Sequence, residues 1–156
     1  MSNLKLGKPF ILLYVLCLLG IIDTLYLTET HLRRAALVCG AVSGLSKCNI
    51  VATSAYSVIY GIPVAILGLL FYVAVLTGTA YYSYGRNKLI LRWLLFFVGA
   101  GILFSFYLLY VQAFILKAFC QYCIASDLLT ALILIIFIIL YKRDYINSPQ
   151  IIKDGR

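Results

Sequence analysis

The chain consists mainly of four long runs of apolar residues, separated by more polar stretches. The runs cover residues 10–28, 60–82, 91–116 and 119–141. Each run is close to the roughly 20 residues that an α-helix needs to cross the hydrocarbon core of a bilayer. The pattern therefore predicts an all-α membrane protein whose four transmembrane helices form a bundle.

The composition of the chain supports a membrane protein. Of the 156 residues, 64% are hydrophobic and only 12% are charged. A water-soluble domain of this size cannot bury so much apolar surface. Because the runs leave no segment long enough for a separate soluble domain, we expect residues 1–156 to form a single integral membrane domain.

The connections between the runs differ greatly in length. Residues 29–59 form a stretch about five times as long as a typical connection, and long connections in compact domains tend to be functional. By contrast, only Lys117 and Ala118 separate the third run from the fourth. We therefore expect the third and fourth helices to be antiparallel neighbours, and a long loop to join the first and second helices.

The basic residues are distributed unevenly between the two sides of the predicted bundle. Four spans place both termini and the connection 83–90 on one side, which holds nine of the thirteen lysines and arginines. The side richer in positive charge faces the cytoplasm in most membrane proteins. We therefore expect a multi-pass protein of the cell (inner or plasma) membrane, with cytoplasmic termini and an extracytoplasmic long loop. The nine are Lys5, Lys8, Arg86, Lys88, Arg92, Lys142, Arg143, Lys153 and Arg156.

Two cysteine pairs fall on the extracytoplasmic side of this arrangement. Cys39 and Cys48 lie in the long loop, and Cys120 and Cys123 form a Cys-Gln-Tyr-Cys motif where the fourth run begins. Residues three apart share one face of a helix, and the positive end of a helix dipole favours a thiolate. Disulfides persist in oxidising compartments, and two pairs can pass a disulfide between them by thiolate attack on sulfur. The pattern predicts a redox relay whose loop pair faces water and whose helix pair faces lipid.

Other interpretations of the cysteines are possible. Four cysteines can bind zinc, but such a site is unusual on an oxidising face, so we expect no metal. The pairs can also form structural disulfides that stabilise the loop of a non-enzymatic tetraspan protein. That interpretation does not explain why a Cys-x-x-Cys motif lies at the start of a helix. Unrelated four-helix disulfide-generating oxidases carry the closely spaced pair in their first external segment, the reverse of the order here. The fifth cysteine, Cys17, has no nearby partner and is expected to be a small apolar core residue.

Several short segments carry a set of residues that resembles a known family. They are Leu25-Tyr-Leu-Thr28, Cys48-Asn-Ile-Val-Ala-Thr-Ser54, Tyr60-Gly-Ile-Pro63, Gly68-Leu-Leu-Phe-Tyr72, Leu103-Phe-Ser-Phe-Tyr107 and Phe119-Cys-Gln-Tyr-Cys-Ile-Ala-Ser126. Together with the two ordered cysteine pairs, they resemble the vitamin K epoxide reductase family over nearly the whole chain.

The resemblance implies a function as well as a fold. Members of the family are four-helix quinone reductases that take electrons from a thioredoxin-like protein through a loop cysteine pair and pass them through a helix pair to a quinone. By resemblance, Cys39 and Cys48 are the shuttle pair, Cys120 and Cys123 are the pair beside the quinone, and Ser54 is similar to a serine that helps to hold the site. The function implied is a membrane thiol:quinone oxidoreductase that supports disulfide formation, with a quinone of the ubiquinone, menaquinone or vitamin K type.

The chain also departs from the family pattern. Where animal members have an asparagine and a tyrosine at the vitamin K site, this chain aligns Val64 and Asp127, which favours plain quinone reduction over the alternative of vitamin K epoxide reduction. Many members carry a fused thioredoxin-like domain, whereas we expect this chain to use a separate thioredoxin-like protein. Candidate contacts to the quinone are Val64, Tyr122 and Asp127. Asp127 lies one helical turn beyond Cys123, where a carboxyl can supply a proton to a quinone oxygen.

The relative positions of the cysteines also predict an order of electron transfer. We expect the partner to attack the Cys39–Cys48 disulfide at Cys48, and the released Cys39 to attack Cys120. Cys123 then reduces the quinone, since it lies deeper in the predicted span than Cys120.

Overall fold

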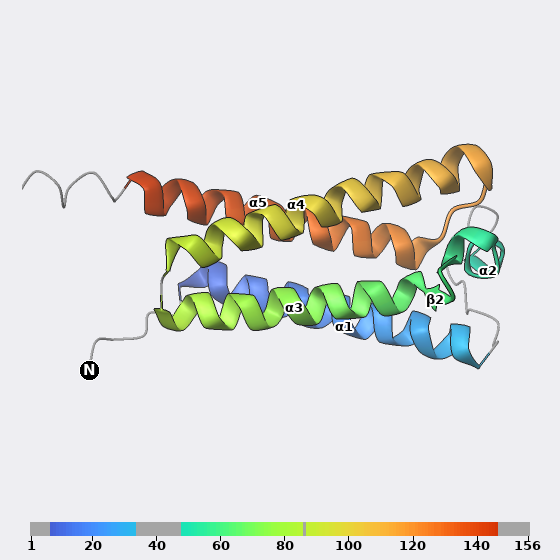
Figure 1. Ribbon diagram of the computed structural model, residues 1–156, viewed down its shortest axis with the longest axis horizontal. Helices are drawn as coiled ribbons and strands as arrows, with labels where there is room; N and C mark the ends of the chain where they lie inside the picture. Colours follow the sequence, from blue (N-terminus) through green and yellow to red (C-terminus); the bar gives the residue numbers. More distant parts are fainter. Residues whose placement is uncertain (1–6, 34–47, 86, 147–156) are drawn as a thin grey trace, which may run out of the picture.

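The protein is a bundle of four long helices in a computed structural model that describes residues 7–33, 48–85 and 87–146. The helices are α1 (Lys8–Leu32), α3 (Val64–Gly85), α4 (Lys88–Tyr110) and α5 (Gln121–Ile146). Helix α1 packs against α3 and α5, and α4 packs against α5 and α3 (Figure 1). All four are long and apolar enough to cross a membrane, over Pro9–Leu32, Val64–Gly85, Lys88–Ile115 and Gln121–Arg143. The predicted bundle of four transmembrane helices is confirmed.

Buried apolar side chains from all four helices form the core of the bundle. The fully buried members include Leu13 and Cys17 of α1, Val75 of α3, Val98 of α4 and Phe137 of α5. Cys17 is therefore a core residue, as expected. Large apolar side chains also cover much of the outer surface of the helices, which suits contact with lipid.

A close contact between α1 and α3 depends on Gly20. A Cβ atom at this position would overlap the ring of Tyr72, which is itself buried. The missing side chain lets the aromatic ring of α3 lie directly against the backbone of α1, in the manner of small residues at membrane helix interfaces. This contact aims the Tyr72 hydroxyl toward α5, where it is hydrogen-bonded to Ser126.

Short elements cover one end of the bundle, between α1 and α3 in the chain. They are α2 (Cys48–Ala52), the 3₁₀ turn η1 (Ala55–Ser57) and the strands β1 (Val58–Ile59) and β2 (Ile62–Pro63). In Figure 1, α2 lies at the end of the bundle opposite the start of α1 and the end of α5. The rest of the expected long loop, residues 34–47 with Cys39, lies outside the described residues.

The second apolar run begins as a hairpin and not as a helix. β1 and β2 pair antiparallel, with Val58 opposite Pro63, and the turn residues Tyr60 and Gly61 have φ angles of 50° and 83°. Two left-handed residues are what a tight two-residue hairpin requires. The prediction that the second helix starts at Tyr60 is therefore wrong, because backbone geometry at Gly61 outweighs the apolar character of the segment. The helix starts at Val64.

The link between the third and fourth helices also differs from the prediction. Helix α4 runs into a π-helical turn, η2 (Val111–Ile115), and α5 starts only at Gln121, so residues 116–120 form the link instead of Lys117 and Ala118 alone. The amide of Leu116 donates to the carbonyl of Val111, five residues back, at 2.9 Å. Lys117 then has a left-handed backbone, with φ 47°, which ends the turn. As a result, Cys120 lies before the first helical residue of α5.

Candidate functional site

Cys120 is the N-cap residue of α5. Its carbonyl accepts the first helical hydrogen bond, from the amide of Ile124 at 3.0 Å. Its sulfur accepts a hydrogen bond from the amide of Cys123 at 3.4 Å, as the side chain of a capping residue does with the third helical N–H. The Cys-x-x-Cys spacing therefore brings the two cysteines together as predicted, although only Cys123 lies within the helix.

This position favours the thiolate form of Cys120. Hydrogen bonds from Cys123 lower the pKa of the Cys120 thiol from its usual 9.0 to about 7, with smaller contributions from the Tyr122 backbone and the Cys48 side chain. Burial acts in the opposite direction and is outweighed. Cys120 is only 1% exposed, so this thiolate is held by protein groups rather than by water. A thiolate is the nucleophile in disulfide exchange, and Cys120 is therefore prepared for it.

Cys48 lies directly against Cys120. It is the first residue of α2, it is fully buried, and its side chain is hydrogen-bonded to that of Cys120. The half-buried side chains of Tyr26, Leu27 and Val51 pack around the two cysteines. The prediction that Cys48 faces water is wrong, because α2 folds back over the end of the bundle and covers this thiol.

Gln112 holds the link that carries Cys120. Its side chain is 2% exposed, and its Oε1 accepts a hydrogen bond from the amide of Cys120 at 2.9 Å. Its backbone carbonyl accepts a hydrogen bond from the amide of Ala118 at 3.1 Å. The sequence motifs did not identify Gln112 as a site residue. The available signal was an amide side chain inside an apolar run, since a polar group at membrane depth needs a partner.

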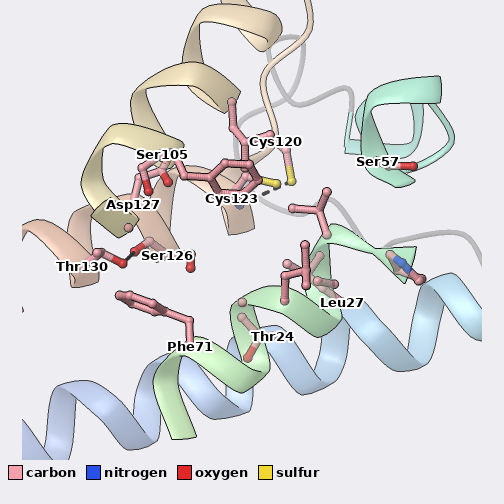
Figure 2. A pocket seen from close by; sticks show the side chains of 18 of the residues that line it. Thr24, Leu27, Ser57, Phe71, Ser105, Cys120, Cys123, Ser126, Asp127 and Thr130 are labelled. Atoms are coloured by element: carbon pink, nitrogen blue, oxygen red, sulfur yellow. Dashed lines mark hydrogen bonds between the residues drawn. The ribbon is translucent and has the colours of Figure 1, made fainter. Parts of the chain in front are cut away.

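A cavity of about 610 Å³ lies beneath the cysteines, between the helices of the bundle. Both Cys120 and Cys123 line it, as do the predicted site residues Ser54, Val64 and Asp127. The lining is mostly apolar. Ser126, Asp127 and Thr130 of α5 lie at one side of the cavity, and Thr24 and Ser57 lie across from them (Figure 2). Its size is within the range of about 300–1,000 Å³ that is usual for small-molecule sites.

Tyr122 occupies a different place from the other predicted contacts. It is not among the residues that line the cavity. Its ring instead packs against that of Tyr26, with 5.2 Å between the ring centroids. Tyr122 thus belongs to the cover around Cys48 and Cys120.

A polar cluster lies below Cys123 on α5. The Tyr72 hydroxyl donates to the Ser126 carbonyl at 2.8 Å and lies 3.0 Å from the hydroxyls of both Ser126 and Thr130. Asp127 is hydrogen-bonded to Ser105 of α4, and the two side chains meet at the cavity in Figure 2. The cluster therefore joins three helices at the depth where Cys123 faces the cavity.

Two carboxyl groups in this region have an unpaired oxygen. The Oδ2 atoms of Asp23 and Asp127 are buried and have no hydrogen-bond partner among the described residues. Both carboxyls are close enough to Cys123 and to the Tyr72 hydroxyl to interact with them electrostatically. Only Asp127 lines the cavity. Its free oxygen is thus available to a polar group of a ligand.

Ser54 joins the short elements that cover the site. Its hydroxyl donates to the carbonyl of Val51 at 2.8 Å, and its carbonyl accepts hydrogen bonds from the amide and the hydroxyl of Ser57 at 3.0 and 2.7 Å. It thereby ties α2 to η1 at the edge of the cavity. This placement agrees with the supporting role that the resemblance implies for Ser54, and that role stays a prediction.

The arrangement can carry out thiol exchange next to a bound apolar molecule. Cys48, Cys120 and Cys123 follow one another from the covered end of the bundle to the cavity, and a disulfide can move along such a series by successive thiolate attacks. In the described part of the chain, no group of three or more His, Cys, Asp or Glu side chains is placed to hold a metal ion.

A comparison with known protein families agrees with this chemistry. The sequence model of the Vitamin K epoxide reductase family matches residues 11–138 of the 156-residue chain. The matched segment includes most of α1, all of α3 and α4, the first two thirds of α5, the short elements and each cysteine described above. The chain therefore belongs to the vitamin K epoxide reductase family.

Proposed function

We propose that this protein is a thiol:quinone oxidoreductase that oxidises a thioredoxin-like partner and reduces a membrane quinone. As a member of its family, it is in general terms a membrane oxidoreductase that acts between thiols and quinones. The observation that carries the specific proposal is the series of thiols: Cys48 is buried against Cys120, and Cys123, hydrogen-bonded to Cys120, lines an apolar cavity.

The quinone fits the cavity by its chemistry. A quinone combines an apolar ring and tail with two carbonyl oxygens, and the cavity combines a mostly apolar lining with a smaller number of polar groups. Val64 contributes only an apolar surface, and Asp127 offers a buried oxygen without a partner. When bound, the quinone accepts two electrons and two protons, and oxidation of two thiols to one disulfide releases the same number of each.

The electrons enter the protein at Cys39 in this proposal. The order expected from sequence had the partner attack Cys48 and Cys39 attack Cys120. The burial of Cys48 against Cys120 favours the reverse order. The partner thiolate attacks Cys39 of the Cys39–Cys48 disulfide, and a second partner thiol completes the reduction. Cys39 lies outside the described residues, so its part in the proposal rests on the sequence.

The disulfide then moves outward from the cavity. The Cys48 thiolate attacks Cys120 of the Cys120–Cys123 disulfide, which forms a Cys48–Cys120 bond and releases the Cys123 thiolate. The Cys39 thiolate attacks Cys48, which restores the Cys39–Cys48 disulfide and releases Cys120. Cys120 and Cys123 are now both reduced, and they return to a disulfide when the quinone is reduced.

The orientation in the membrane is part of the proposal. The excess of basic residues at the termini and at 83–90 supports a cytoplasmic position for that end of the bundle. The opposite end, where α2 and the cysteines lie, then faces the oxidising side (Figure 1). A thioredoxin-like protein on that side would supply the electrons and leave with a new disulfide.

Quinone turnover by the purified protein tests the proposed function. We expect the protein in lipid nanodiscs, with a reduced thioredoxin-like donor, to reduce a soluble quinone analogue, followed by its ultraviolet absorbance. Cys48→Ser, Cys120→Ser and Cys123→Ser should each abolish turnover. The matched control is Cys17→Ala, which removes the core cysteine and should keep turnover. Full turnover in Cys123→Ser would exclude the proposal.

Trapping of mixed disulfides tests the electron order separately. Cys39→Ser should accumulate a Cys48–Cys120 bond, because no thiolate remains to release Cys48. The bond is detected by mass spectrometry of non-reduced digests. Cys48→Ser is the matched variant and should not accumulate a Cys39–Cys120 bond. The opposite pattern would support the order expected from sequence.

A further inference from the structure

We propose that Gln112 is a positioning residue for Cys120, holding its backbone so that the sulfur stays both at the N-cap of α5 and against Cys48. The inference rests on the proposed exchange between Cys48 and Cys120. It requires no quinone, so it can fail or hold independently of quinone turnover.

The first support is the location of Gln112. Its side chain is almost completely buried at the cavity, in the π-helical turn η2. An amide side chain in such an apolar place is costly unless it is hydrogen-bonded. The group it bonds is the amide of Cys120, eight residues later in the chain. Because that group is a donor, the side-chain atom that faces it must be the oxygen.

The second support is the position of Cys120 before the helix. The amides at the start of a helix have no partner within the helix and must find one elsewhere. The amide of Cys120 is also buried, so water cannot easily replace a lost partner. Gln112 satisfies this amide, and the link is thereby fixed at the residue that carries the reactive sulfur.

The third support is the π-helical turn itself. Because of this turn, one residue can hold the link at two points: its carbonyl binds the amide of Ala118 and its side chain binds that of Cys120. The π-helical turns of proteins are rare and are frequently found at functional sites. Without the side-chain bond, Gln112 would hold the link only through the amide of Ala118, and Cys120 could move away from the amide of Cys123.

The expected consequence is a loss of thiolate at Cys120. The hydrogen bonds that favour the thiolate come from Cys123, Tyr122 and Cys48, and each depends on where the Cys120 sulfur lies. A shift of that sulfur weakens these bonds together. For an upward shift of one pH unit in the ionisation of Cys120, the thiolate fraction at pH 7 falls about fivefold.

The test compares Gln112→Met with Gln112→Glu. Methionine has nearly the same length but no strong acceptor, whereas glutamate keeps an oxygen at the same reach. The first readout is hydrogen–deuterium exchange at the amide of Cys120, which should become faster in Gln112→Met and stay slow in Gln112→Glu. The second is the pH profile of Cys120 alkylation by iodoacetamide, located by peptide mass spectrometry. That profile should move to higher pH in Gln112→Met. The background is Cys17→Ala and Cys39→Ser, fully reduced before alkylation, so that Cys48 stays beside Cys120.

A matched control separates positioning from general loss of stability. Thr79→Val also removes a buried hydrogen bond, since the Thr79 hydroxyl donates to the Val75 carbonyl at 2.7 Å within α3. It should leave both readouts unchanged. If Gln112→Met does not fold, Gln112→Asn replaces it, because its oxygen is one methylene too short to reach Cys120. An unchanged alkylation profile in the variant used, or an equal shift in Thr79→Val, would overturn the proposal.

Discussion

At the scale of single residues, Cys120 takes a position that Ser, Thr, Asp or Asn usually holds. These residues cap helices because a side-chain oxygen accepts an unpaired N–H of the first turn. In this protein a sulfur accepts it, from Cys123 at 3.4 Å. A sulfur that carries negative charge is a better acceptor than a neutral thiol. The cap and the thiolate therefore stabilise each other, and the start of α5 is most stable when Cys120 is ionised.

The first prediction concerns the pH dependence of this thiol. The pKa of Cys120 lies at about 7, below its usual 9.0, so the thiolate forms as pH rises through 7. We expect its alkylation rate to rise between pH 6 and 8 and to level off above. Cys123→Ala removes the hydrogen-bonding side chain and should move this rise to higher pH. A rate in the unchanged protein that still climbs steeply between pH 8 and 9 would contradict the prediction.

The second prediction concerns Asp127 in the cavity. Asp127→Asn should slow quinone reduction by about a hundredfold or more, because a general acid typically contributes that much. Thiol exchange between Cys48 and Cys120 should be unaffected. Both steps are measured separately, by stopped-flow absorbance of the quinone and by trapping of the mixed disulfide. Asp23→Asn is the matched control, since Asp23 is not among the cavity-lining residues and should have the smaller effect. Equal turnover in Asp127→Asn and the unchanged protein across pH 5–8 would contradict it.

At the scale of elements, the packing of the long helices fixes the position of the polar cluster below the cysteines. Helix α1 packs against both α3 and α5. The side chain of Tyr72 reaches from α3 to α5, where its hydroxyl is hydrogen-bonded to Ser126. The hydroxyl of Tyr72 is bound by Ser126 and Thr130 on the same helix that carries Cys123. The packing of α3 on α1 at Gly20 is thus connected to the position of the polar cluster below the cysteines.

The third prediction tests this connection. Gly20→Ala should lower the free energy of unfolding by about 1–3 kcal/mol, because overpacking forces the Tyr72 ring from its place. Gly99→Ala is the matched control. A Cβ at Gly99 meets no atom within 4 Å, and alanine favours a helix over glycine by up to about 1 kcal/mol. Thermal unfolding in detergent measures both. Equal stability of the two variants would show that the contact at Gly20 is not tightly packed.

At the scale of the whole molecule, every thiol of the described relay lies at one end of the bundle. Cys48, the first residue of α2, packs against Cys120, and Cys123 lines the cavity. The end of α3 and the start of α4, which carries Lys88 and Arg92, lie at the opposite end (Figure 1). One end of the bundle therefore carries the thiols and the other carries the basic residues. The proposed function requires that the two ends face different compartments.

The fourth prediction is the orientation of the bundle. In a background that lacks the other cysteines, Tyr60→Cys should react with a membrane-impermeant maleimide added to intact cells, because Tyr60 is fully exposed at the hairpin. Lys88→Cys should react only after the cells are opened. Labelling is read by the mass shift of the protein on a gel. The reverse pattern would place the cysteines in the cytoplasm and remove the argument from an oxidising compartment.

The apolar runs were sufficient to predict the helices, because a continuous apolar segment of about 20 residues satisfies its own backbone groups in a bilayer only as a helix. Their ends were less predictable. Tyr60 and Gly61 are apolar enough for a span but form a tight turn, and hydropathy carries no information on φ. In the same way, the link at residues 116–120 depends on a π-helical turn that no residue pattern indicates.

The site was predictable where it depended on spacing. The Cys-x-x-Cys motif identified Cys120 and Cys123, and Asp127 follows at one helical turn. The surroundings of Cys48 were not predictable, because the polar residues near it in sequence suggested water, whereas α2 folds it against Cys120. Gln112 was missed for a related reason, since its partner is eight residues away across an irregular turn.

The cover over Cys48 and Cys120 has a consequence for where electrons can be lost. Both cysteines are at most 1% exposed, so a large hydrophilic thiol has no direct access to them from water, and only a molecule small enough to enter the cavity reaches Cys120. On the proposed function, glutathione-like molecules therefore cannot reduce this pair directly. The rate of quinone reduction is then governed by the partner protein that docks at the loop, and not by the thiol balance of the surrounding solution.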